Sequence, residues 1–334
     1  MLHSLLHYNT FGIDAKCDDF IEYSSVNELL GILPSIKGKR WLQIGGGSNL
    51  LFVHDFNGTV LHSQIKDCEL IDSDENKVRL RVGSGYVWDD FVDYCVNNHY
   101  YGLENLSYIP GEVGASAVQN IGAYGVEVQQ FISKVETLEV ATGKPRIFDK
   151  DECEYAYRSS IFKHQLRGKY IVTHVVYELN KNFNPDLEYG GIQKALQANN
   201  ISKNALTARQ LRDVIIAVRK AKLPEPSEVG SAGSFFMNPI VGEEKFKELL
   251  SKYPQMPHYL MPNGVKIPAG WMIDQCGWKG KRLGNAGVYE KQALVLVNLG
   301  GAKGCEIVEL SNAICNDVKQ KFGIDIHPEV NFIE

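Results

Sequence analysis

A glycine-rich stretch at residues 109–125 limits, more than any other segment, what this chain can fold into. It reads Ile-Pro-Gly-Glu-Val-Gly-Ala-Ser-Ala-Val-Gln-Asn-Ile-Gly-Ala-Tyr-Gly, with four glycines, one proline and a single charged side chain. Glycines let several backbone N–H groups converge without a Cβ in the way. Because such N–H clusters hold phosphate oxygens, the stretch predicts a backbone site for a phosphate-bearing ligand.

A second glycine loop, Gly-Gly-Gly-Ser-Asn at residues 45–49, follows the apolar segment 41–44, which is a candidate for a buried strand. Taken alone, this loop is explained equally well by a tight turn. Neither glycine loop matches the GxGxxG pattern of a dinucleotide βαβ unit or the GxxxxGK[ST] pattern of a P-loop. The sequence therefore disfavours both a Rossmann site and a P-loop.

The hydrophobic pattern indicates a mixed chain of 334 residues, long enough for two or three lobes. Residues 10–70 are interpreted as alternating short strands and turns. Further strands are predicted at 77–83, 132–149, 169–179 and 293–299, and helices at 88–98, 207–222, 243–252 and 304–322. Thr207 is a candidate N-cap, and the prolines of Leu223-Pro-Glu-Pro226 end that helix and indicate a domain boundary.

Charge and cysteine usage exclude several classes of protein. The formal net charge of -5 disfavours a nucleic-acid binder. The seven cysteines are odd in number and form no CxxC pair, which argues against a disulfide framework or a zinc site. The chain begins without a signal-peptide pattern, and no apolar run approaches the roughly 18 residues that span a bilayer. We therefore expect a cytoplasmic protein with reduced thiols, no metal and no membrane partner.

Eight motifs, in this order along the chain, resemble the UDP-N-acetylenolpyruvoylglucosamine reductases. Each motif is weak alone, but their ordered occurrence over nearly the whole chain is specific. They are Gly45–Asn49, Pro110–Ala115, Gln119–Gly125, Tyr157–Lys163, Lys222–Pro224, Gly233–Pro239, Ala269–Cys276 and His327–Val330.

The resemblance implies an α+β protein with the two-lobed FAD-binding fold of the superfamily that includes vanillyl-alcohol oxidase, plus a separate α+β substrate-binding domain. The FAD-binding lobes are expected at 1–68 and 69–221, with 323–334 returning to the second lobe, and the UDP-sugar domain at 222–322. It further implies non-covalent FAD, NADPH as co-substrate, a UDP-sugar substrate and a monomer. The preference for NADPH over NADH comes from the resemblance only.

The reaction implied by the resemblance reduces an enolpyruvyl ether to a lactyl ether. NADPH reduces FAD, hydride passes from flavin N5 to C3, and a proton must reach C2. Ser234 matches the family's proton donor, Arg158 its arginine beside the developing enolate, and Glu329 its C-terminal catalytic glutamate. Outside these motifs, a serine after glycine, an arginine and a glutamate are more often a turn residue and two solvated charges.

The resemblance also assigns binding residues. The residues matched to FAD binding lie in the two glycine loops: Gly45, Gly46, Gly47, Ser48, Asn49, Pro110, Gly111, Gly114, Ala115, Ser116, Gln119, Asn120, Gly122, Ala123 and Gly125. The residues matched to the UDP-sugar are Tyr124, Tyr189, Arg219, Lys222, Asn238 and Gln292. One position departs from the family: Asn331 stands where members often have arginine two residues after the catalytic glutamate.

Two other functions remain open at the level of sequence. A flavin-dependent oxidase of the same fold would act on another small alcohol or acid, although such oxidases often tether FAD through His or Cys and the glycine loops hold neither. A non-catalytic flavin or UDP-sugar sensor would have no need for the proton donor and the enolate-stabilising residues that this chain retains.

Overall fold

The chain forms two compact units in a computed structural model that describes residues 2–334. Unit 1 comprises residues 17–46 and 57–221, and unit 2 comprises residues 2–16, 47–56 and 222–334. The division at Ala221 and Lys222 falls where the sequence suggests that the UDP-sugar domain begins. Residues 323–334, expected with the second FAD-binding lobe, cluster instead with unit 2, because their strand pairs with a strand from residues 47–56.

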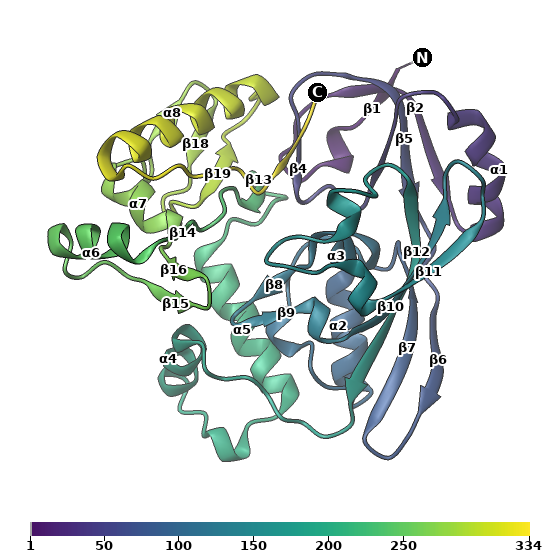
Figure 1. Ribbon diagram of the computed structural model, residues 1–334, viewed down its shortest axis with the longest axis horizontal. Helices are drawn as coiled ribbons and strands as arrows, with labels where there is room; N and C mark the ends of the chain where they lie inside the picture. Colours follow the sequence, from purple (N-terminus) through teal and green to yellow (C-terminus); the bar gives the residue numbers. More distant parts are fainter. Residues whose placement is uncertain (1) are drawn as a thin grey trace. The chain divides into compact units, whose positions relative to one another are not determined.

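A five-stranded sheet in the order β11-β10-β12-β7-β6 forms the centre of unit 1 (Figure 1). All its pairings are antiparallel. The strands are β6 (Cys68–Ser73), β7 (Lys77–Gly83), β10 (Ile132–Glu139), β11 (Pro145–Asp149) and β12 (Tyr170–Asn180). Alternate residues of β7 are buried, as its polar–apolar pattern predicts.

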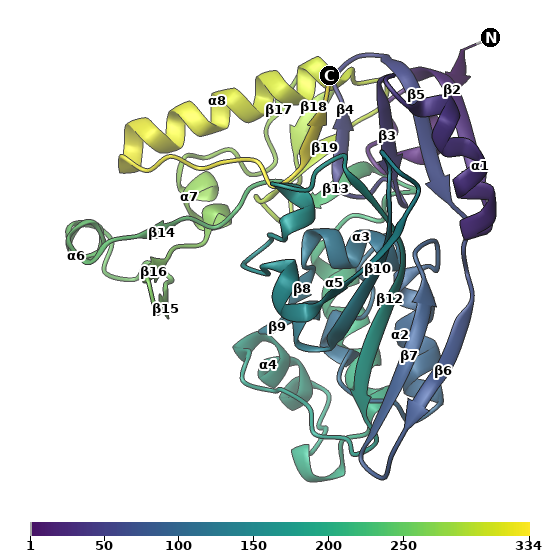
Figure 2. The same ribbon diagram turned by 45° about the vertical axis from the view of Figure 1, so that its right-hand side comes forward.

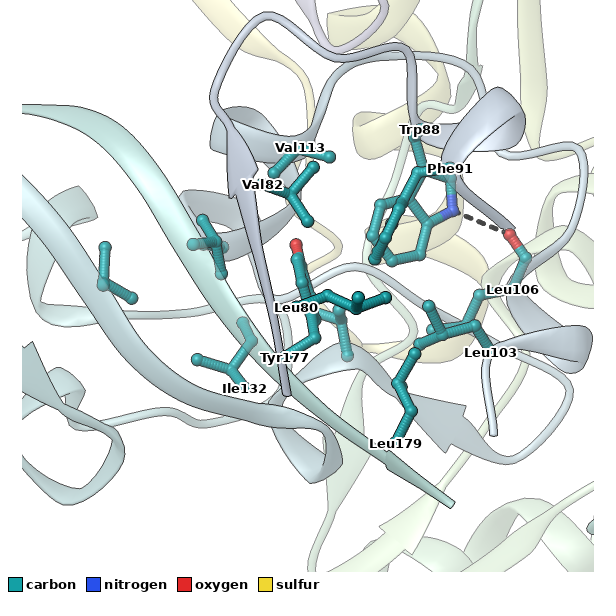
Figure 3. Packing of buried hydrophobic residues seen from close by; sticks show 14 of the residues in the cluster. Leu80, Val82, Trp88, Phe91, Leu103, Leu106, Val113, Ile132, Tyr177 and Leu179 are labelled. Atoms are coloured by element: carbon teal, nitrogen blue, oxygen red, sulfur yellow. Dashed lines mark hydrogen bonds between the residues drawn. The ribbon is translucent and has the colours of Figure 1, made fainter. Parts of the chain in front are cut away.

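Helices α2 (Trp88–Asn97) and α3 (Val113–Gln119) cover one face of this sheet. The core between them is fully buried at Trp88, Phe91 and Tyr177, and the Trp88 Nε1–H donates to the carbonyl of Leu106 at 2.9 Å (Figure 3). Burying aromatic side chains of this size is a major favourable contribution to folding. The core thus fixes α3, and with it the second glycine stretch, against the sheet.

The rest of the N-terminal part of unit 1 holds a parallel strand pair and a helix. Strand β3 (Trp41–Ile44) pairs with β5 (Phe56–Ser63) in parallel, and β2 spans Lys16–Tyr23. Helix α1 (Val26–Ile36) buries Leu29, Leu33 and Ile36 in a second hydrophobic core, which it shares with residues of neighbouring strands. The expectation of only strands and turns over residues 10–70 was wrong here, because Ser25 accepts from the Glu28 N–H and caps a helix that accommodates Pro34.

Helix α5 (Ala208–Lys222) is attached to α2 by ion pairs. The buried Arg212 donates to both carboxylate oxygens of Asp89, at 2.6 and 3.0 Å, and to Asp93 at 3.1 Å. Apolar residues of α5 also pack against α4 (Gly190–Ala198). The planar guanidinium suits this two-oxygen contact, so the pair helps to position α5 together with the apolar contacts to α4.

Unit 2 contains a sheet of order β13-β19-β18-β17, against which helix α8 packs (Figure 2). Its strands are β13 (Gly230–Ser234), β17 (Arg282–Leu283), β18 (Ala286–Val288) and β19 (Val295–Asn298). The helices of this unit are α6 (Glu243–Lys252), α7 (Ala269–Gln275) and α8 (Gly304–Phe322). Helices α7 and α8 meet through the rings of Trp271 and Phe322, whose centroids lie 5.5 Å apart.

Short strands complete the fold. A second small sheet in unit 2 joins β14 (Ile240–Val241), β16 (Gly264–Lys266) and β15 (Tyr259–Met261), and β20 (Asn331–Ile333) pairs in parallel with β4 (Leu50–Phe52). The remaining strands are β1 (His3–Ser4), β8 (Gly122–Ala123) and β9 (Val126–Glu127). Within residues 2–334, no helix is both long and apolar enough to cross a bilayer.

Most of the predicted elements are confirmed within a few residues. Helices are present at 88–97, 208–222, 243–252 and 304–322, and strands at 77–83, 132–139, 145–149, 170–180 and 295–298. The predicted cap is present as well, since Thr207 Oγ1 accepts from the Gln210 N–H at 3.2 Å. Helices α3 and α7 were not predicted, because each spans only seven residues and begins in a segment rich in glycine or proline.

We predict that Arg212→Met lowers the free energy of unfolding by about 3 kcal/mol, since it leaves the partly buried Asp89 carboxylate without its cation. Chemical denaturation of the purified variant measures this loss. Arg209→Met is the matched control, because Arg209 pairs with Asp93 from the same helix but is 43% exposed, so its loss should cost less than about 1 kcal/mol. If both variants lost the same free energy of unfolding, the pair of Arg212 and Asp89 would not have the stabilising role predicted here.

Candidate functional site

The two glycine loops meet through their backbones in unit 1. A Cβ built on Gly46 would lie 3.3 Å from the Cα of Gly111, and one on Gly45 would lie 3.4 Å from the Cβ of Ala115. Gly47, in unit 2, has φ of +62° and no space for a side chain, because a Cβ there would lie 2.1 Å from the Tyr8 carbonyl oxygen. The loops predicted to share a ligand are therefore adjacent, and the glycines make that approach possible.

Part of the second glycine stretch has a structural use instead. Gly114 donates its N–H to the Ser84 carbonyl at 2.9 Å. Ser116 is buried, with its hydroxyl bonded to the Val113 carbonyl and to the Tyr177 hydroxyl. The Asn120 side chain donates to the Ala156 carbonyl at 2.8 Å and to a carboxylate oxygen of Glu127 at 3.0 Å. These polar groups are engaged within the protein, and the assignment of Gly114, Ser116 and Asn120 to FAD binding stays a prediction.

The tail of the stretch forms a hairpin of β8 and β9 with Tyr124 and Gly125 as its two-residue turn. Both residues have positive φ, at 50° and 88°, as a type I′ turn requires. A tyrosine in this conformation is strained, so the surrounding contacts must hold it. The Asn105 side chain donates to the Tyr124 carbonyl at 3.2 Å and to the Asp186 carbonyl at 2.9 Å.

Three residues expected to bind the UDP-sugar gather beside this turn. The Tyr124 ring lies edge-on to the Tyr189 ring with centroids 5.4 Å apart, and Arg219 donates its Nε–H to the Tyr108 carbonyl at 3.0 Å. Desolvation lowers the pKa of Arg219, although the hydroxyl of Tyr124 opposes this. Burial raises the pKa of Tyr124, although Arg219 opposes it. A desolvated cation beside two phenols is a suitable anion site.

Arg158 occupies a tight turn that the fold holds in an uncommon conformation. The turn is closed by two hydrogen bonds between Ala156 and Ser159, of 3.0 and 3.1 Å, and Arg158 has φ of 56°. Its Nη2 donates to the Gly122 carbonyl at 2.6 Å, and Lys163 Nζ donates to the carbonyl of Arg158 at 3.0 Å. Lys163 also donates to Gln119 Oε1 at 2.7 Å, which ties the turn to the second glycine stretch.

Ser234 is directed outward by a bulge in unit 2. Strand β13 pairs with β19 so that Ser231 is opposite Val297 and Ser234 is opposite Val295, which leaves one extra residue on β13. Gly233 takes up the bulge with φ of +67°. Ser234 is exposed while Phe235 and Phe236 after it are buried, so the bulge re-aims the serine relative to the strand.

Glu329 lies on a segment that runs beside Ser234. Its backbone N–H donates to the carbonyl of Phe235 at 2.7 Å, and Met237 donates to the carbonyl of His327 at 2.9 Å. The backbone of Glu329 also contacts the first glycine loop, since Asn49 Nδ2 donates to its carbonyl at 3.5 Å. Main-chain hydrogen bonds thus hold the segment of Glu329 beside that of Ser234.

Asn331, where relatives often have arginine, has a defined role in this chain. Its backbone N–H and its Nδ2 both donate to the Asn49 carbonyl, at 3.1 and 3.0 Å. These two bonds join the start of β20 to the first glycine loop in unit 2. Asn331 therefore fixes backbone geometry through a neutral amide, and it brings no positive charge to the end of the chain.

The substrate residues predicted in unit 2 divide into two groups. The amide of Asn238 accepts from the Ala269 N–H at 2.9 Å, and Gln292 Oε1 lies 3.1 Å from the position of a Cβ on Gly270. Both amides therefore gather at the start of α7. Lys222 is exposed at the last residue of α5, where the helix dipole alone would not favour an anion.

Several polar residues of the candidate site were missed at the level of sequence. Glu112 is the single charged residue of the second glycine stretch, and its carboxylate is hydrogen-bonded to His62 at 2.8 Å. Two of these residues could have been found from their place in the sequence. Lys163 ends the motif Tyr157–Lys163, and Asn105 lies just before the second glycine stretch. Across the described part of the chain, no group of three or more His, Cys, Asp or Glu side chains is arranged to hold a metal ion.

Two known protein families match this chain, one in its N-terminal part and one in its C-terminal part. Residues 225–333 match the C-terminal domain of UDP-N-acetylenolpyruvoylglucosamine reductase, and residues 20–149 match an FAD binding domain. The UDP-N-acetylenolpyruvoylglucosamine reductase of Bacteroides fragilis strain YCH46 is 56% identical over 333 residues, which cover 99% of each chain. The enzyme of that name from Porphyromonas gingivalis strain W83 is 49% identical over 328 residues, covering 97% of this chain and 96% of that one.

Solved structures agree on the fold. A UDP-N-acetylenolpyruvylglucosamine reductase from Thermus caldophilus superposes with a TM-score of 0.70 at 21% identity, covering 100% of this chain and 98% of that one. A solvent-stable cholesterol oxidase superposes with a TM-score of 0.50 at 12% identity, covering 98% of this chain and 86% of that one. At these identities the likeness concerns the fold alone, and it confirms the predicted fold of FAD-binding oxidases with a separate C-terminal domain.

We predict that Gly46→Ala destabilises unit 1 by about 1–3 kcal/mol, because the new methyl group is forced toward the backbone of Gly111. Thermal unfolding measures the loss. Gly31→Ala is the matched control: no atom lies within 4 Å of its Cβ position in α1, so it should stabilise the protein by about 0.5–1 kcal/mol. A Gly46→Ala variant as stable as the parent would show that the loops can separate freely.

Proposed function

This chain belongs to the UDP-N-acetylenolpyruvoylglucosamine reductase family, and from that premise we propose that it reduces UDP-N-acetylglucosamine enolpyruvate to UDP-N-acetylmuramate, a precursor of peptidoglycan, with FAD as cofactor and NADPH as electron donor. The supporting observation is the 56% identity to a reductase of that name over 333 residues, which span both units. A flavin oxidase acting on another small alcohol or acid gives no reason for the match over 225–333 to the reductase's C-terminal domain.

The glycine loops fit FAD. Gly45, Gly46 and Gly111 carry no side chains where the two loops meet, and we propose that the diphosphate approaches backbone N–H groups there. Gly122, Ala123 and Gly125 lie in the hairpin of β8 and β9, and we propose that they bind FAD as well. Bound there, the reduced flavin supplies the hydride for C3 of the enolpyruvyl group.

Arg158 is proposed to stabilise the negative charge that develops on the enolpyruvyl carboxylate after hydride addition. Its turn presents a guanidinium whose Nη2 is bonded to the Gly122 carbonyl, so the group is oriented before substrate binds. A cation fixed in advance lowers the barrier because little reorganisation is left to the transition state. Lys163 supports this by holding the carbonyl of Arg158.

Ser234 is proposed to give the proton to C2, and Glu329 to assist it. A neutral hydroxyl is a weak acid, but an enolate carbon is basic enough to accept its proton. The bulge at Gly233 exposes Ser234, and the hydrogen bond between Glu329 and Phe235 holds the carboxylate-bearing residue to the same strand segment. We propose that Glu329 orients the serine or polarises the enolate.

The UDP-sugar is proposed to use six residues. Tyr124, Tyr189 and Arg219 of unit 1 offer two phenols and a desolvated cation for the diphosphate. Asn238 and Gln292, at the start of α7, offer amide groups, and Lys222 offers an ammonium group. In Asn238 the carbonyl oxygen is held by Ala269, which leaves its NH₂ oriented to donate.

Two half-reactions test the function directly. Anaerobic NADPH should bleach the flavin absorbance of the purified protein, and UDP-N-acetylglucosamine enolpyruvate should restore it. Ser234→Ala should bleach normally, because nothing in that step needs the hydroxyl, and should fail to recover. Bleaching without recovery in the parent protein would point to another oxidant, and a protein that binds no flavin would contradict the proposal.

Arg158→Lys is expected to lower kcat by about 10²–10³-fold, the range seen when one oxyanion-stabilising donor is removed. Lysine keeps the charge but loses the planar fork that reaches the Gly122 carbonyl. Flavin binding and bleaching by NADPH should stay near the parent's level, which stopped-flow absorbance separates from the second half-reaction. An unchanged rate of flavin recovery would remove Arg158 from the proposed mechanism.

A further inference from the structure

A histidine lies between two carboxylates next to the glycine loops. His62 Nε2 is 2.8 Å from Glu112 Oε1, and His62 Nδ1 is 2.9 Å from Glu22 Oε1. The His62 side chain is 12% exposed and that of Glu112 10%, whereas Glu22 is 45% exposed. The three side chains therefore form a chain from the second glycine stretch toward solvent.

This geometry requires protons on both ring nitrogens. An ionised carboxylate can only accept hydrogen bonds, so each nitrogen that faces one must donate. Gln64 Nε2 lies 3.1 Å from Nδ1 and donates to the same Glu22 oxygen at 2.6 Å. Its second N–H can reach an unprotonated Nδ1, but the 2.9 Å contact between Nδ1 and Glu22 Oε1 would then join two acceptors. A neutral imidazole has one N–H and would leave one carboxylate contact without a hydrogen. His62 is thus an imidazolium when both contacts are made.

Glu112 brings its charge to the loops themselves. Its second oxygen, Oε2, lies 3.1 Å from the position that a Cβ would take on Gly45, and its own backbone adjoins Gly111. A buried carboxylate here would repel the diphosphate of a dinucleotide unless a cation neutralised it.

We propose that His62 is a positioning residue for the cofactor: as an imidazolium it neutralises the Glu112 carboxylate beside Gly45, so that the glycine loops retain FAD. The inference rests on the proposed function only in taking FAD as the ligand of the loops. It concerns retention of the flavin and not the chemistry at the enolpyruvyl group. His62 acts through the charge of Glu112.

The charges around His62 decide how this contact responds to pH. Burial lowers the pKa of His62, but Glu112 first and Glu22 second outweigh burial and raise the pKa above 6.5. Lys66 acts on Glu22, the Tyr23 hydroxyl faces Glu112, and the Phe20 ring lies 6.2 Å from the imidazole. A raised pKa means that the pairing is complete below 6.5 and is lost as pH rises through the folded value.

Release of flavin from the diluted holoenzyme tests the proposal, followed by the gain of free-flavin fluorescence between about pH 5.5 and 8.5, a range that brackets the ordinary histidine pKa. Release from the parent protein should accelerate as pH rises. His62→Gln should release flavin about tenfold faster at the low end, the scale of one charge-assisted hydrogen bond, and lose the pH dependence. Glu112→Gln should release slowly at every pH.

The double variant separates the proposed interaction from general damage. His62→Gln combined with Glu112→Gln should return to slow release, because no uncompensated charge remains beside Gly45. His174→Gln is the matched control, since His174 is also buried and contacts a carboxylate, Asp67, at 3.3 Å, but lies on β12. Thermal unfolding of each holoenzyme checks that the variants are folded.

Two results would overturn the proposal: parent-like release and pH profile in His62→Gln, or a double variant that releases as fast as His62→Gln. Either result leaves the proposed function intact if flavin still bleaches and recovers. A parent protein that retains no flavin at any pH would instead contradict the proposed function itself.

Discussion

The contact between two glycine loops is the constraint on which the candidate cofactor site depends. A Cβ on Gly46 would lie 3.3 Å from the Cα of Gly111, which is tighter than an ordinary contact, so the Gly111 backbone would have to shift slightly to accept it. The first loop is placed by the parallel pair of β3 and β5, and the second by α3 on the five-stranded sheet. The apolar core of unit 1 thus acts on ligand binding through the spacing of two backbones.

The candidate site also depends on residues held in conformations that they do not favour. Tyr108, Asn120, Tyr124 and Arg158 all have positive φ although none is glycine. Such residues persist only where neighbours hold them, and each has identified neighbours. Asn105 braces the carbonyl of Tyr124, and Lys163 braces that of Arg158. The local strain therefore places a phenol and a guanidinium where a relaxed turn would have placed glycine.

Buried charge is handled differently in each part of unit 1. Arg212 is compensated by a carboxylate held by two hydrogen bonds, and this pair positions α5. His62 lies between two carboxylates, which raise its pKa against the effect of burial. Arg219 is desolvated, and the hydroxyl of Tyr124 opposes the resulting fall in its pKa. In unit 2, by contrast, the candidate residues Ser234 and Glu329 are placed by main-chain hydrogen bonds.

The sequence by itself identified the family through the resemblance of its ordered motifs. It also predicted the two glycine loops and the longer helices and strands, because hydrophobic periodicity and glycine spacing are local properties. It named Ser234, Arg158 and Glu329 through motif resemblance, and their roles remain proposals. Only the tertiary structure decided that Ser116 and Asn120 turn into the protein, that a bulge exposes Ser234, and that His62 meets Glu112 across 50 residues of chain. Burial, register and long-range pairing depend on where distant segments pack, and no local pattern encodes that.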